Sequence, residues 1–116
     1  MSKITQISDE TYIFNAEPNI HDAWTATLLM KKHDDHLNIY VQICMSYLHH
    51  IEDYERLLNE IRHFCKQSKE VMKKEKCTVN FHCQGIACFQ DIFSLPAFEN
   101  PDHREYIDTS FSEEIQ

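Results

Sequence analysis

The sequence predicts an α+β fold in which a sheet of three to five mainly antiparallel strands carries one long amphipathic helix on one face. Two observations predict it. Between about residues 51 and 76, apolar side chains recur every three or four positions, which is the period of a helix with one buried stripe. The segments on either side alternate apolar and polar residues, as half-buried strands do. The strands are therefore expected to cover the helix stripe.

The chain before the helix is expected to form a short strand and then a hairpin. Residues 11–16 (TYIFNA) are rich in β-formers, and a proline-containing break follows them. Residues 24–32 fit either a strand or a capped helix, and we favour the strand because the polar residues 33–36 (HDDH) suit a hairpin loop. Residues 37–45 then alternate cleanly. Their apolar side consists of Leu37, Ile39, Val41, Ile43 and Met45.

The predicted helix from Ile51 to Lys76 carries charges that suit its direction. Glu52 and Asp53 lie in its first turn, whereas lysines crowd its end. An acidic start and a basic end complement the helix dipole, so the lysine run has a structural explanation. The apolar stripe consists of Ile51, Tyr54, Leu57, Leu58, Ile61, Phe64, Cys65, Val71 and Met72.

The chain after the helix is expected to add two more strands and an acidic tail. Residues 77–83 (CTVNFHC) alternate, Gln84-Gly85 can form a tight turn, and residues 86–93 can return as a partner strand. Residues 97–116 are an acidic segment that would be an edge strand, a short docked helix or a mobile arm, and the pattern does not separate these. Residues 1–116 are predicted to form a single domain.

Composition narrows the classes of function. The chain has one glycine, so no P-loop, dinucleotide fingerprint or nucleophile elbow can be assembled from it. The formal net charge of −8 lies mainly in the terminal segments. Such a balance disfavours direct binding of nucleic acid or an anionic membrane, and it permits a protein partner with a basic surface.

The N-terminal residues lack the apolar run of a signal peptide, and no uncharged stretch reaches the ~20 residues of a membrane span. Five cysteines are an odd number with no disulfide-like spacing. We interpret them as reduced thiols and expect a cytoplasmic protein.

Cys77, His82, Cys83 and Cys88 form the densest group of metal-ligating residue types. Their spacing lacks a C-x-x-C pair, and the adjacent His82 and Cys83 would point to opposite faces of a strand. No metal or other cofactor is therefore predicted, and a metal-binding sensor is only a secondary alternative. No cysteine lies at a helix N-terminus, and the paired carboxylates look outward, so no catalytic residue is assigned and an enzyme is not expected.

The combined observations predict a small acidic protein-binding regulator. Its most concrete version is an inhibitor or immunity protein that covers the basic cleft of a partner such as a toxic nuclease. The first alternative is an oligomeric assembly component or secretion-type chaperone, and the second is the Cys/His metal-binding sensor or enzyme. The sequence is also compatible with a homo-oligomer. The predicted partner-binding residues are Glu99, Asp102, Glu105, Tyr106, Asp108, Phe111, Glu113 and Glu114.

Overall fold

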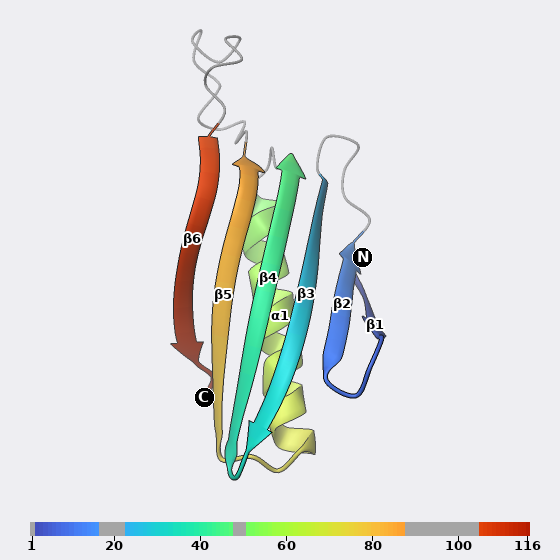
Figure 1. The fold of residues 1–116 in the computed structure, drawn as a ribbon, viewed down its shortest axis with the longest axis vertical. Coiled ribbons are helices and arrows are strands. Elements are labelled where there is room, and N and C mark those ends of the chain that lie inside the picture. Colours follow the sequence, from blue (N-terminus) through green and yellow to red (C-terminus); the bar gives the residue numbers. More distant parts are fainter. Residues whose placement is uncertain (1, 17–22, 48–50, 88–104) are drawn as a thin grey trace, which may run out of the picture.

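A computed structural model of the chain describes residues 2–16, 23–47, 51–87 and 105–116. Over these residues a six-stranded mixed sheet carries one helix on one face, which confirms the α+β class (Figure 1). The elements are β1 (Ser2–Gln6), β2 (Thr11–Ala16), β3 (Ala23–His33), β4 (His36–Tyr47), α1 (Ile51–Val71), β5 (Lys76–Ala87) and β6 (Glu105–Glu114). The predicted strand number of three to five was too low.

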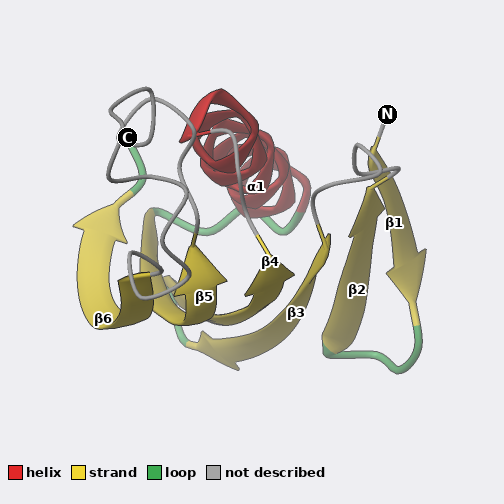
Figure 2. Cartoon of the chain, turned by 90° about the horizontal axis from the view of Figure 1, so that it is seen from above, coloured by secondary structure: helices red, strands yellow, loops and turns green. Residues whose placement is uncertain are grey.

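The strands lie side by side in chain order from β1 to β6. Neighbours pair antiparallel everywhere except between β4 and β5, which run parallel. The helix explains this exception, because α1 crosses back over the sheet between β4 and β5 and so restarts the chain at the same end. The sheet curves around α1, which lies on one side of it (Figure 2). The opposite side of the sheet is called the outer face.

The segment left open between strand and helix is a strand, β3, which pairs with β4 as a hairpin. The hairpin turns at Asp34, whose φ of 51° is a left-handed conformation that aspartate tolerates. The predicted apolar side of β4 is buried from Leu37 to Met45, at 0–4% exposure. Both predictions are therefore confirmed, while residues 20–22 lie outside the described part of the chain.

The helix ends at Val71, five residues before the predicted Lys76. Lys73 takes a φ of 54°, its amide donates to Glu70 O, and the Lys74 amide donates to Lys69 O. This pair of hydrogen bonds is the Schellman motif, which normally has glycine at the left-handed position. The apolar period did not predict this ending, because a lysine at the left-handed position is not the glycine that normally marks a helix end. The last lysines therefore belong to a loop and to β5 rather than to the helix.

Gly85 does not form the predicted turn, and residues 86 and 87 continue β5 instead of starting the predicted return strand. β5 continues through Gly85 to Ala87, and the antiparallel partner of β5 is β6. Gly85 has a φ of 140°, and a Cβ atom there would lie 1.9 Å from Met45 O on β4. The glycine is therefore required for the close approach of two strands, not for a reversal. Residues 88–93 lie outside the described ranges.

The core lies between α1 and the inner side of the sheet. Leu57, Leu58, Ile61 and Cys65 of the helix stripe are at most 8% exposed. The alternation of residues 77–83 correctly predicted that Cys77, Val79, Phe81 and Cys83 share the buried side of β5. The helix stripe is thus covered by the strands from Leu57 to Cys65, as expected from its period. Val71, which the period also assigned to the stripe, is 79% exposed at the end of α1, so that part of the prediction was wrong.

Candidate functional site

The three of the four candidate metal ligands that the structure describes do not converge. Cys77 and Cys83 are both buried on the inner side of β5, about 20 Å apart for six residues of extended chain. His82 lies on the outer face, and Cys88 is outside the described residues. Within the described ranges, no group of three or more His, Cys, Asp or Glu residues is placed to hold a metal ion.

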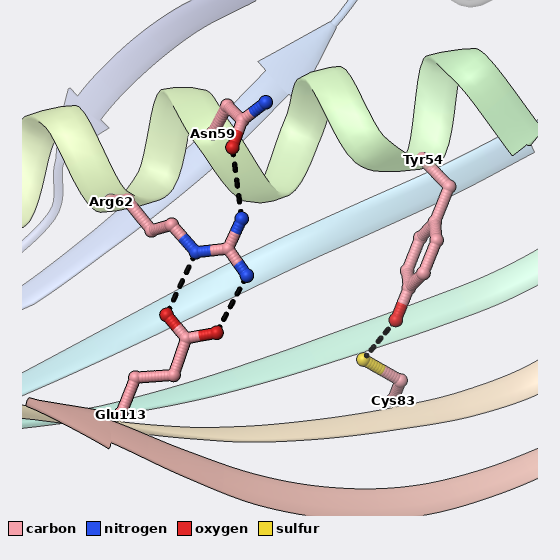
Figure 3. Close-up of polar contacts among 5 residues, drawn as sticks. All are labelled: Tyr54, Asn59, Arg62, Cys83 and Glu113. Atoms are coloured by element: carbon pink, nitrogen blue, oxygen red, sulfur yellow. Dashed lines mark hydrogen bonds and ion pairs between the residues drawn. The ribbon is translucent and has the colours of Figure 1, made fainter.

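The buried thiols belong to the core. Burial raises the pKa of Cys65, Cys77 and Cys83, which keeps these thiols uncharged. The hydroxyl of Tyr54 on α1 donates to Cys83 Sγ at 3.0 Å, and this contact helps to hold the helix on β5 (Figure 3). A thiol without thiolate character is a poor nucleophile.

The predicted partner-binding residues do not share one surface where they are described. Phe111 and Glu113 point to the inner side of β6, where the Phe111 ring stacks on Phe81 at a centroid distance of 4.9 Å. Asp108 and Glu114 point to the outer face. Glu105 and Tyr106 begin β6, and Glu99 and Asp102 lie outside the described residues.

Glu113 forms an intramolecular ion pair that ties β6 to α1. Arg62 Nε donates to Glu113 Oε2 at 2.8 Å and Nη2 donates to Oε1 at 2.6 Å, while Nη1 donates to Asn59 Oδ1 at 2.8 Å (Figure 3). The guanidinium also lies 5.9 Å from the centroid of the Phe81 ring. The hydrogen bonds from Arg62 lower the pKa of Glu113, as expected for a bidentate pair.

A second polar contact joins three strands on the outer face. His82 Nδ1 lies 2.8 Å from Gln42 Oε1, and His82 Nε2 lies 2.9 Å from Asp108 Oδ1. Ser110 is the register partner of His82, so the residue types of a hydrolytic triad are together. Both ring nitrogens already face oxygen atoms, however, and neither faces Ser110 as a base would. We name Gln42, His82 and Asp108 the histidine clasp.

A groove that the sequence did not reveal runs between α1 and the β1–β2 hairpin. Its volume is about 610 Å³. Phe14 and Phe64 form an apolar floor, with ring centroids 5.6 Å apart, and Ile4 of β1 lines it at 42% exposure. The other lining residues come from α1 at helical spacing and are Glu52, Glu55, Arg56, Asn59, Glu60, His63 and Gln67.

The groove has an acidic rim. Glu52, Glu55 and Glu60 contribute three carboxylates, against the single guanidinium of Arg56. Arg56 in turn contacts Asp53, the residue three positions before it on α1, so part of its charge is already compensated. An apolar floor beneath a negative rim is suited to a positively charged segment that also carries apolar side chains. We name these three glutamates the groove acids.

Comparison with protein-family models, with curated proteins and with solved structures found no match for this chain. Over the residues that the structure describes, no helix combines the length and apolar character needed to cross a membrane.

Proposed function

We propose that the protein is a protein-binding regulator that takes a basic segment of a partner protein into the groove beside α1. The observation that carries this proposal is the combination of an apolar floor at Phe14 and Phe64 with the three groove acids above it. Buried aromatic and aliphatic contacts supply most of the affinity of an interface, and charges around them steer the encounter.

The partner is expected to carry lysine or arginine next to apolar side chains. The overall charge of −8 favours the approach of such a surface and disfavours direct contact with nucleic acid. A nuclease fits this description, because a cleft that holds phosphates must be basic. Inhibition of a toxic nuclease, as by an immunity protein, is therefore the most concrete form of the proposal.

The experiment compares three forms of the chain against one purified partner. Partners retained from a nuclease-treated lysate are identified by mass spectrometry, purified, and measured by surface plasmon resonance at low and high salt. The groove variant is E52Q/E55Q/E60Q. The control variant, D9N/D35N/E75Q, removes the same number of charges from exposed positions outside the groove lining.

At low salt, the association rate of the groove variant with the partner is expected to be at least roughly tenfold lower than that of wild type. High salt is expected to reduce this difference. The control variant should bind like wild type. An equal loss in both variants would mean that only net charge matters, and an unaffected groove variant would remove the groove from the interface.

The acidic C-terminal residues are the competing location for the contact. The variant E99Q/D102N/E114Q tests them and leaves the Arg62–Glu113 ion pair intact. If this variant loses binding while the groove variant keeps it, the C-terminal acids and not the groove hold the partner. For a nuclease partner, the same variants are compared for inhibition of substrate cleavage.

A further inference from the structure

The outer face is open over the part of the chain that the structure describes, because α1 covers only the inner side of the sheet (Figure 2). Its central side chains are uncharged and include Thr27, Leu29, Tyr40, Asn80 and Ser112. Two carboxylates also lie on this face: Asp108 pairs with His82 in the histidine clasp, and Glu114 lies at the end of β6.

The distribution of charged side chains favours this face for contact between two copies of the chain. Two chains of net charge −8 repel each other, so an interface between them costs least where no carboxylates are brought face to face. The groove acids exclude the helix side from such a contact. At the centre of the outer face the side chains around the hollow carry no carboxylate, and the nearby carboxylate of Asp108 is already hydrogen-bonded to His82, so a second copy can approach with little opposition of like charges.

The outer face carries a hollow and an exposed aromatic side chain beside it. A hollow of about 590 Å³ spans β3 to β6, and Tyr40 lies at its border with 47% of its surface exposed. Under a two-fold axis, Tyr40 of each copy can enter the hollow of the other, which is the reciprocal pattern of an isologous interface. The hydrogen bond from Ser112 Oγ to Asn80 Oδ1, at 2.8 Å, and the histidine clasp restrain the hollow before contact.

We propose that the outer face is the interface of a symmetric dimer of this chain. The area of this interface is roughly 500 Å² per copy, because it spans four strands at their usual spacing and four outward residues along β4. Two copies therefore bury about 1,000 Å², at the lower end for a specific interface, so the dimer is weak and reversible. In this dimer the layers follow the order helix, sheet, sheet, helix, and the groove of each copy remains open on the outside.

The test is sedimentation equilibrium from low micromolar to near millimolar concentration. The mass of wild type is expected to rise from monomer towards dimer over this range. Y40A removes the side chain that fills the hollow, and T27E places a carboxylate on the interface; each should weaken the dimer at least tenfold. Q116E adds the same charge at an exposed site and should dimerise like wild type. Circular dichroism melting verifies that each variant is folded.

Cys44 supplies a second measurement that does not depend on substitution at the interface. It is exposed on the outer face, whereas Cys65, Cys77 and Cys83 are buried. In a C88S background, maleimide labelling of Cys44 should slow as protein concentration rises. A monomeric mass at every concentration, or a dimer that persists in both Y40A and T27E, would overturn the proposal. The groove variant E52Q/E55Q/E60Q should dimerise normally, so this test fails or succeeds independently of the proposed function.

Discussion

At the scale of single residues, two positions contribute in different ways to the attachment of the last strands. Gly85 allows β5 to approach the backbone of Met45, and Glu113 fastens β6 to Arg62 on α1. One acts through the absence of a side chain and the other through a charge. Their substitution should therefore affect stability by different routes.

The change G85A introduces a methyl group where a Cβ would lie 1.9 Å from Met45 O, in a φ region that alanine disfavours. We expect the free energy of unfolding to fall by about 2–4 kcal/mol, measured by urea denaturation. T109A, at an exposed position of β6, is the control and should change it by less than about 0.5 kcal/mol. Unchanged stability in G85A would contradict the close approach.

The change E113Q should lower the free energy of unfolding by about 1 kcal/mol at neutral pH, because the partly exposed pair with Arg62 is weakened. The pKa of Glu113 is lowered in the folded state, so the pair stabilises the fold above the ordinary glutamate pKa of about 4.3 and the effect disappears as pH falls below it. Wild type and E113Q should therefore converge in acid. E114Q, one residue away and exposed, is the control and should match wild type at each pH.

At the scale of elements, the end of α1 depends on a lysine in an unfavourable conformation. K73G should raise the free energy of unfolding by about 0.5–1 kcal/mol, because glycine adopts the φ of 54° without steric cost. K66G, the same substitution at an exposed position inside α1, should lower it by about 1 kcal/mol. Equal effects of the two changes would contradict the Schellman ending.

An element could be predicted when its sequence signal lies within the element itself. The alternation of apolar and polar residues in 37–45 and 77–83 predicted burial correctly, since a strand that is covered on one side points every second side chain into the core. β1 was missed because Ser2–Gln6 carries no apolar run, and Gly85 was misinterpreted because its role depends on Met45, which is distant in sequence. The groove was missed for the same reason, as Ile4, Phe14 and Phe64 meet only through the pairing of β1 with β2 and the crossover of α1.

At the scale of the whole molecule, the two proposed contact surfaces lie on opposite sides of the sheet. The groove acids are on the helix side, and the neutral hollow is on the outer face. A dimer through the outer face would carry two grooves directed away from each other, so a partner with two basic segments would be held more tightly than either segment alone. Binding through the groove and association through the outer face should then be measurable separately in the variants described above.

The parallel pairing of β4 with β5 also bears on how the chain reaches its native state. Strands β1 to β4 can join as consecutive hairpins, but the second side of β4 stays unpaired until α1 has crossed the sheet and β5 has arrived. During synthesis, a growing chain that stops before residue 76 exposes the free backbone groups of β4 and the apolar inner surface next to them. The interval between the emergence of β4 and the docking of β5 is thus when an unpaired strand edge and an uncovered apolar surface of this chain are exposed together.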